Sequence, residues 1–250
     1  MILFKKRGVR IGEVWFDEQS AEINADLIFY LQQPTPVANS FVTPKQTILV
    51  DIRRDTNALF SDCNKGCQYE IRRSRDRDGV CCYALDSHNL EVMTRFQTVY
   101  DKFANTKGLE KLDFRHFRLL VEADALDIST ACDKEGNPLV YHAYLAQRPR
   151  SRLLYSVSLF RAGKDSQRRN LFGRANRYLH WEDMLRFKQA GYTKYDWGGW
   201  CPDKSNVARQ QINRFKEEFG GIVIKEWDCE KAITVKGRLA LIYRLLCRKV

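Results

Sequence analysis

The chain has 250 residues, of which 44% are hydrophobic and 29% are charged, and its formal net charge is +11 at pH 7. This composition excludes a largely disordered chain, and the length suits one large domain or two small ones. The positive charge favours anionic partners such as phosphates, nucleotides, RNA or an acidic membrane surface, but it does not choose among them.

Targeting signals and metal motifs are not expected. No run of about 18 apolar residues is present, so we expect no membrane-spanning helix. The opening MILFKKRGVRIGEVWF places basic residues after apolar ones, which is the wrong order for a secretory signal. The eight cysteines contain no CxxC pair, so we expect no metal site, no required disulfide, and reduced thiols in a cytoplasmic protein.

A proline-containing loop divides the chain near its start. LQQPTPVANSFVTP (31–44) carries three prolines and separates an N-terminal segment, residues 1–45, from a main domain that we place at 46–250. We expect the segment to be a partial extra subdomain. QTILVDI (46–52) predicts a buried strand, because apolar and β-branched residues follow one another there.

Three helices are expected after this strand. Residues 55–79 form the first, capped by Asp55 or Thr56, with Gly66 as a weak point in its interior. Helical spacing of apolar residues then predicts two further helices, at 87–109 and at 113–124.

Strands and helices alternate in the second half. LDISTACD and PLVYHAYLAQ flank KEGN, which predicts a hairpin, and a strand is expected at 152–162. Helices are predicted at 176–192 and 205–221, each ending at a glycine. TKYDWGG and IVIKEWD are expected strands, and the tail GRLALIYRLLCRK is either an amphipathic helix or a final strand. This order argues for a mixed α/β (α+β) domain with a central sheet.

A basic stretch precedes the helix predicted at 176–192. Within it, NLFGRANR places Gly173 and Ala175 just before the expected helix start at Asn176, and small residues let backbone amides approach a phosphate closely. We therefore expect residues 170–177 to form an anion-binding loop, with an ordinary solvated loop as the alternative. The nine basic residues of 148–177 are Arg148, Arg150, Arg152, Arg161, Lys164, Arg168, Arg169, Arg174 and Arg177.

The segment YDWGGW (195–200) combines one acid, two adjacent glycines and three aromatics. Glycine pairs are common where a strand ends or where a ligand approaches the main chain. Alternation along a strand puts Tyr195 and Trp197 on one face and Asp196 on the other. We expect a strand end at which Asp196 faces a site, with a simple strand-to-loop turn as the alternative.

These elements resemble the GNAT acyltransferase fold, a central mixed sheet flanked by helices. That family has a donor loop of pattern Q/R-x-x-G-x-G/A. The resemblance implies that the acyl-CoA donor binds here at residues that fit this loop with its leading basic residue displaced, namely Arg169, Asn170, Gly173, Arg174, Ala175 and Asn176.

The closer likeness is to the FemAB-type branch, whose members use aminoacyl-tRNA to build peptidoglycan bridges. LHW, YDWGG and RFKEEFGG look like the spaced signature of that branch, and QYEIRRSRDRDGV looks like its N-terminal element. The likeness covers roughly residues 46–230. Two departures are visible: 250 residues leave hardly any room for two GNAT-like domains, and Phe215 stands where many acyl-CoA-dependent members have a tyrosine acid.

The resemblance and the residues together give a candidate site. Lys216 of the FK pair is implied to stabilise the charge of the transfer intermediate, with a surface lysine as the alternative. Asp196 is expected to act as a base or to orient the acceptor amine, and His180 is a second candidate base unless it is a packing histidine. Cys201 is a weaker candidate nucleophile. Residues expected to contact the acceptor or the oxyanion are Tyr69, Arg72, Arg73, Trp197, Gly198 and Gly199.

The function expected from these features is transfer of an acyl group from acyl-CoA to an amine. The acceptor is expected on a cell-envelope, polysaccharide or nucleotide-sugar-linked precursor, with no bound cofactor and with peripheral contact to an anionic membrane as a further partner. One alternative is an aminoacyl-tRNA-dependent transferase of FemAB type. Another is a non-catalytic RNA-binding module, which the core-like spacing of the aromatics disfavours.

Overall fold

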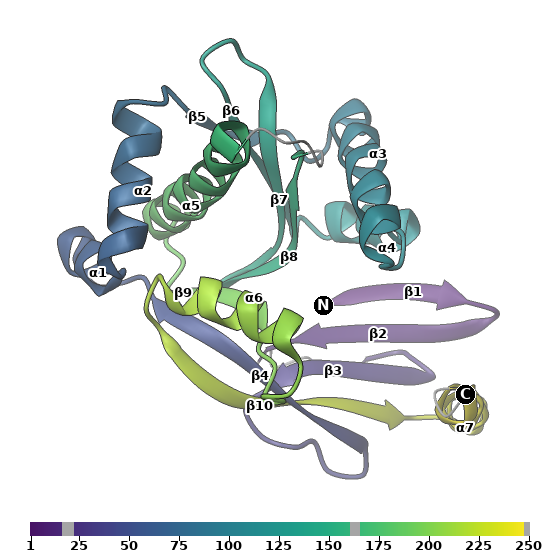
Figure 1. Cartoon of the computed structure of the whole chain (residues 1–250). Helices are drawn as coiled ribbons and strands as arrows, with labels where there is room; N and C mark the ends of the chain where they lie inside the picture. Colours follow the sequence, from purple (N-terminus) through teal and green to yellow (C-terminus); the bar gives the residue numbers. More distant parts are fainter. Residues whose placement is uncertain (17–22, 161–165, 248–250) are drawn as a thin grey trace. The chain divides into compact units, whose positions relative to one another are not determined.

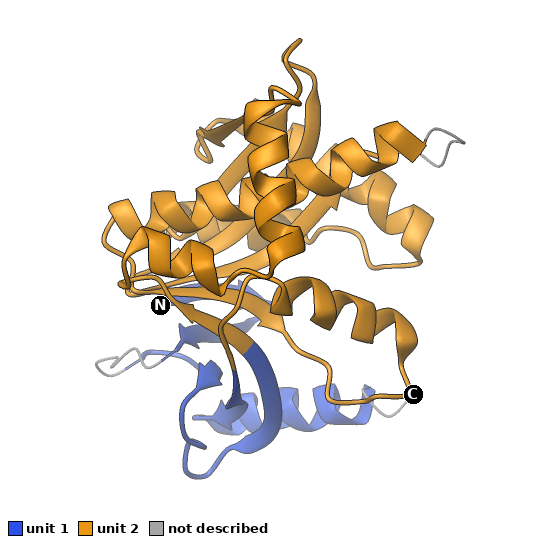
Figure 2. Cartoon of the chain, turned by 60° about the vertical axis from the view of Figure 1, so that its left-hand side comes forward, with its two compact units in different colours: residues 1–47, 223–250 blue, residues 48–222 orange. Residues whose placement is uncertain are grey.

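The structure is a computed structural model that describes residues 1–16, 23–160 and 166–247 (Figure 1). The chain forms two compact units (Figure 2). Unit 1 comprises residues 1–47 and 223–250, and unit 2 comprises residues 48–222. Arg161 and Lys164 of the basic stretch lie outside the described residues.

Unit 1 is a small sheet with one helix. Its strands are β1 (Ile2–Lys6), β2 (Val9–Trp15), β3 (Leu27–Gln33) and β10 (Ile222–Ala232), and its helix is α7 (Val235–Cys247). β1 and β2 are antiparallel, β2 and β3 are parallel, and β3 pairs antiparallel with β10. No strand was predicted within 1–45, and the tail was expected to be either a helix or a strand; it is a helix.

Strand β4 (Phe41–Asp51) runs from unit 1 into unit 2 and includes residues 46–51 of the strand predicted at 46–52. The other strands of unit 2 follow the order β9-β8-β7-β6-β5. All neighbours among these five are antiparallel except β8 and β9. Their bounds are Cys81–Leu85 (β5), Leu126–Cys132 (β6), Pro138–Gln147 (β7), Arg150–Ser158 (β8) and Lys194–Gly199 (β9).

Helices cover both faces of the unit 2 sheet. Figure 1 shows α1, α2 and α5 on one side of β5 to β8, and α3 and α4 on the other. The first face buries a large apolar core that includes Ile71, Leu179, Trp181 and Phe219. The six helices are α1 (Thr56–Asp62), α2 (Lys65–Asp76), α3 (Leu90–Lys107), α4 (Phe114–Glu122), α5 (Ser166–Gln189) and α6 (Val207–Glu217).

Most predicted elements are confirmed, including the β6–β7 hairpin and helices α3 and α4. The single helix expected at 55–79 is wrong. Asp55 caps α1 as predicted, but Cys63 is extended, and the side chain of Asn64 accepts a hydrogen bond from the Cys67 N–H group and so starts α2. Helix α1 therefore ends at the extended Cys63, and the Asn64 cap begins α2.

The loop predicted at 170–177 is also wrong. Helix α5 begins at Ser166, ten residues before the expected start at Asn176, and its first two described turns include Gly173. Glycine costs a helix about 1 kcal/mol relative to alanine. Burial of Phe172 and Ala175 in the core of unit 2 outweighs that cost.

Candidate functional site

The segment YDWGGW lies where two parallel strands separate. Pairing between β8 and β9 runs from Arg150↔Lys194 to Arg152↔Asp196, and both strands continue beyond it. Asp196 therefore occupies the last paired position, and the two glycines follow it. The prediction of a strand end at this segment is confirmed.

The two glycines differ in what their positions require. Gly198 has φ +70°, and a Cβ there would lie 2.9 Å from the Leu153 carbonyl oxygen. Its N–H group donates to Asp196 Oδ1 at 2.8 Å. Gly199 is exposed, and a Cβ there would meet no atom within 4 Å. Gly198 is therefore fixed by backbone conformation, whereas Gly199 borders open space.

Lys216 reaches this strand end from α6. Its Nζ donates to the Gly199 carbonyl at 2.5 Å and contacts the Gly198 carbonyl at 3.4 Å. The residue is only 8% exposed. Burial lowers the pKa of Lys216 to about 8, although the nearby Asp196 carboxylate raises it and Arg152 lowers it further. At pH 7 the side chain is therefore still mainly cationic.

The loop after β9 is tied to α6, and this places Lys216. Asn213 accepts a hydrogen bond from the Cys201 N–H group and donates to the Cys201 carbonyl at 2.7 Å. Gln210 donates to the same carbonyl at 3.0 Å. The thiol of Cys201 lies 3.9 Å from the Asp203 carbonyl, and no base pairs with it in the part of the chain that the structure describes. This geometry gives no support to Cys201 as a nucleophile.

Asp196 is fully buried, and its carboxylate is paired. Arg150 donates to Asp196 Oδ2 from both Nε and Nη2, at 3.0 and 2.6 Å, and Arg152 Nε lies 3.9 Å away. Both carboxylate oxygens are thus engaged by the protein itself, since Oδ2 accepts from Arg150 and Oδ1 accepts from the Gly198 N–H group. The geometry therefore favours a positioning role: Asp196 orients the Gly198 N–H group and offsets the charge of Lys216.

His180 lies inside the core. It is 1% exposed, its Nδ1 lies 2.8 Å from the Tyr195 hydroxyl, and its ring stacks on His142 at 3.9 Å between centroids. Burial holds the pKa of His180 well below its usual value, and His142 and Lys216 add to the effect. The histidine is therefore neutral, and its surroundings match the packing alternative rather than an accessible base.

His180 belongs to a buried polar network that spans the sheet. The Tyr195 hydroxyl lies 2.8 Å from the Tyr144 hydroxyl, which donates to Asp183 Oδ2 at 2.8 Å. His142 Nδ1 lies 2.9 Å from the same Asp183 oxygen. Burial alone would raise the pKa of Asp183, but the hydrogen bond and charge of His142 lower it overall. Other members are Ser129, Asn176 and Arg186.

The residues expected to hold the donor are dispersed along α5. Arg169 and Asn170 are exposed, while Ala175 is fully buried in the core. Arg174 pairs with Asp78, and the Asn176 amide oxygen lies 2.9 Å from His142 Nε2. The Gly173 carbonyl accepts a hydrogen bond from Arg177 Nη1 at 3.2 Å. Because these residues are helical, the structure gives no backbone cradle for a pyrophosphate at this place.

The predicted acceptor residues of α2 lie on its outer side. Tyr69 is 52% exposed and accepts a hydrogen bond from Arg73, and Arg72 lies over the Phe60 ring. The same helix is connected to α6 through Arg177, which pairs with both Glu70 and Glu218. Glu218 is two residues from Lys216, so the Glu70 side of α2 lies near the end of α6.

Trp197, which directly precedes the glycine pair in the sequence, has a buried indole N–H group. Its ring packs between His180 and Phe219, at centroid distances of 4.4 and 4.7 Å. Its indole N–H group is buried, and it has no hydrogen-bond partner among the described residues. Such a group costs free energy unless something satisfies it.

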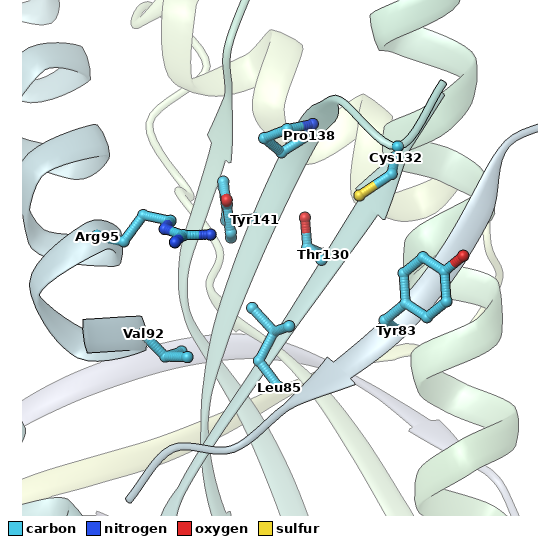
Figure 3. A pocket seen from close by; sticks show the side chains of 9 residues that line it. Tyr83, Leu85, Val92, Arg95, Thr130, Cys132, Pro138 and Tyr141 are labelled. Carbon is cyan, nitrogen blue, oxygen red and sulfur yellow. The ribbon is translucent and has the colours of Figure 1, made fainter. Parts of the chain in front are cut away.

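Other features add no catalytic group. Within residues 1–16, 23–160 and 166–247, no cluster of three metal-ligating side chains occurs and no helix is long and apolar enough to span a membrane. All eight cysteines are free thiols. A separate hollow of about 200 Å³ lies between α3 and strands β5 to β7, lined by Arg95, Thr130, Tyr141 and mainly apolar neighbours (Figure 3). It is smaller than typical ligand pockets of about 300–1,000 Å³.

Several residues at the site were not predicted. Arg150 and Arg152 were counted only as part of a basic stretch, and Tyr144, His142 and Asp183 were not singled out. The alternation within PLVYHAYLAQ could have indicated His142 and Tyr144, because polar groups at positions i and i+2 of a buried strand share one face.

No protein-family model and no curated protein matches the chain. Solved structures do match. FemX is 14% identical and aligns over 80% of this chain with a TM-score of 0.60, and the lysylphosphatidylglycerol synthetase structure from Bacillus licheniformis is 14% identical over 88% with a TM-score of 0.54. The chain therefore shares the fold of these proteins, a GNAT-like fold. The C-terminal domain of a putative lysylphosphatidylglycerol synthetase from Agrobacterium fabrum also shares it, with 12% identity over 86% and a TM-score of 0.55.

This GNAT-like fold confirms the fold class predicted from the sequence. The chain spans 63% of the FemX chain, and it spans 72% and 70% of the two synthetase chains. At these identities the likeness establishes the fold alone. Which reaction this fold carries out depends on the residues at the end of β9.

Proposed function

We propose that this protein transfers an acyl group from an activated carrier to an amine acceptor at the end of β9. One observation carries the proposal: a buried, cationic lysine, Lys216, is held against the carbonyls of Gly198 and of the exposed Gly199. Burying a charged side chain costs free energy, so buried charges occur chiefly at functional sites or in ion pairs.

The reaction requires three changes. The acceptor nitrogen bonds to the donor carbonyl carbon, the carbonyl oxygen takes up negative charge, and the carbon–carrier bond then breaks. The proton lost by the amine passes to the departing carrier, so atoms and charge balance. Lys216 supplies a positive charge to the oxyanion or to the departing oxygen, because its Nζ lies beside the Gly198 and Gly199 carbonyls at the strand end.

We assign the donor to the class of aminoacyl esters, with aminoacyl-tRNA as the carrier. The helical conformation of residues 170–177 supports this choice, because their backbone N–H groups bond within α5 and are not offered to a coenzyme A pyrophosphate. The net charge of +11 suits a polyanionic carrier. The acceptor is proposed to be an amine of a cell-envelope precursor.

Donor binding and transfer test this function. The protein is incubated with radiolabelled total aminoacyl-tRNA, or with radiolabelled acetyl-CoA, together with an envelope-precursor extract. We expect label to leave the tRNA for the extract, and Lys216→Met to slow this about a hundredfold while the exposed Lys204→Met does not. Transfer from acetyl-CoA alone would overturn the donor assignment, and no transfer from either donor would overturn the function.

A further inference from the structure

Helix α7 carries a continuous apolar surface that faces away from the sheet of unit 1. We call it the outer stripe. Its five residues are 55–74% exposed, although each is apolar or aromatic. They are Val235, Leu239, Ile242, Tyr243 and Leu246.

The spacing of these residues places them on one side of the helix. Steps of four, three, one and three residues keep them within a single arc at 3.6 residues per turn. The opposite side packs on unit 1: a Cβ at Gly237 would lie 1.7 Å from the Asp26 carbonyl oxygen, and Arg244 pairs with Glu230. Leu241 also contacts the core of unit 1. The outer stripe is thus additional to the apolar face that holds α7 in place.

Charge around the outer stripe is of one sign. Residues 231–250 hold six lysines and arginines and no aspartate or glutamate. Lys236 and Arg238 are exposed and flank the stripe on its two sides. The end of β1 adds Lys5 and Lys6, and the turn that follows it adds Arg7. This turn adjoins α7, because Lys236 Nζ donates to the Gly8 carbonyl at 2.6 Å.

We propose that α7 lies in the headgroup region of a bilayer that contains anionic lipid, with the outer stripe directed into the acyl chains. Apolar side chains on one face and basic residues along both edges are the features that hold a helix parallel to such a surface. The absence of acidic residues from 231–250 favours this occupant over another protein surface, which pairs charges of both signs. The inference goes beyond the proposed function and does not depend on it.

Sedimentation with lipid vesicles tests the proposal on the full chain, with no donor or acceptor present. We expect binding to vesicles of equal parts phosphatidylglycerol and phosphatidylcholine, and at least about tenfold weaker binding to phosphatidylcholine alone. The double variant Leu239→Glu, Leu246→Glu should lose about tenfold or more of the binding to the anionic vesicles. Leu90→Glu makes the same change at a residue of α3 that is 63% exposed, and it should bind as the unaltered chain does.

A second probe keeps the test decisive if the charged variants fold poorly. Tyr243→Trp places an indole on the outer stripe, and its fluorescence should shift to shorter wavelength with anionic vesicles and be quenched by brominated lipid. An indole that stays in water overturns the proposal. A dimer seen by light scattering without vesicles, and dissociated by Leu239→Glu, Leu246→Glu, would instead make the stripe an interface between two copies.

Discussion

Helices α5 and α6 both pack in unit 2, yet they differ in how far apolar side chains account for their buried residues. Helix α5 buries a row of large apolar side chains, among them Phe172, Trp181 and Phe187. Helix α6 buries Asn213 and Lys216, while its Val207 and Ile212 are 68% and 54% exposed. The usual rule of apolar residues inside holds for α5 and is reversed in α6.

The buried polar groups of the two helices also differ in how they are satisfied. Asp183 of α5 accepts hydrogen bonds from the Tyr144 and Ser129 hydroxyls and lies 2.9 Å from His142 Nδ1. Arg186 pairs with its other oxygen, so the carboxylate is satisfied within the fold. Lys216 of α6 donates to two main-chain carbonyls, and its pKa is lowered. We therefore expect the Asp183 carboxylate to stabilise the fold, and we expect the Lys216 ammonium, whose burial is unfavourable, to serve the reaction. Changes at the two helices should therefore separate stability from activity.

The largest expected effect is on the α5 side. Asp183→Ala leaves His142, Tyr144 and Arg186 without their shared buried partner, and it should lower the free energy of unfolding by about 3–5 kcal/mol. Chemical denaturation measures it. Glu182→Ala, at the next position of α5, should cost under about 1 kcal/mol, because burial raises the pKa of Glu182 and so disfavours its charge. Equal losses in the two variants would refute the stabilising role of the network.

On the α6 side, Lys216→Met should act in the opposite way. We expect about a hundredfold slower transfer with no loss of stability. The drop of the Lys216 pKa from 10.5 to about 8 corresponds to roughly 3 kcal/mol of unfavourable burial of the charge. Part of that cost should be recovered at pH 7 as a higher melting temperature. A variant that loses both activity and stability would show that Lys216 is structural.

Substitutions at the two adjacent glycines should have smaller effects on stability, and these effects should differ between the two positions. Gly198→Ala introduces a side chain at φ +70° against the Leu153 carbonyl, and it should cost about 1–3 kcal/mol of stability. Gly199→Ala meets no neighbouring atom and should leave stability within about 0.5 kcal/mol. If Gly199 borders the substrate, its variant should still slow transfer. Unchanged transfer in Gly199→Ala would remove this residue from the site.

The smallest effect is the dependence of transfer on pH. If the Lys216 cation is required, the rate should be level near pH 7 and fall about tenfold for each pH unit above 8, as the lysine loses its proton. Stability should change the other way: the unfolded lysine keeps its proton up to about pH 10, so the stability of the native state rises between about pH 8 and 10. Lys216→Arg, which does not titrate there, should remove the fall in rate. A fall that persists in Lys216→Arg belongs to another group.

The sequence predicted the order of elements in unit 2 and the strand end at YDWGGW, since periodicity and glycine placement are local signals. The start of α5 was missed, because Gly173 and its arginines resembled a loop while the burial that holds them helical comes from distant residues. The four strands of unit 1 were predicted only in part: β10 was expected, but β1 to β3 were not. Their pairing joins segments that no local pattern connects.

Site residues show the same division. Lys216, Asp196 and Gly198 lie within one stretch of the chain and were named in advance, and the structure brings them together. The roles of Asp196 and His180 were harder to predict, because they depend on Arg150 and on Tyr195, and the latter joins a network of partners about 40 to 50 residues apart. Hydrogen-bond partners at that separation are set by the fold, so a sequence shows the residue but not its partner.

The pairing of β3 with β10 has a consequence for how the chain is made. The Gln32 N–H group donates to Asp228 across 196 positions of sequence, and the Gln32 side chain bonds to Glu226 across 194. On a ribosome, strands β1 to β3 leave the exit tunnel long before β10 exists, and the whole of unit 2 is synthesised in between. Unit 2 is thus inserted in the sequence of unit 1, and all of it is synthesised before β10. Until β10 pairs with β3, that edge of β3 is unpaired, and it is the surface that a chaperone would have to shield.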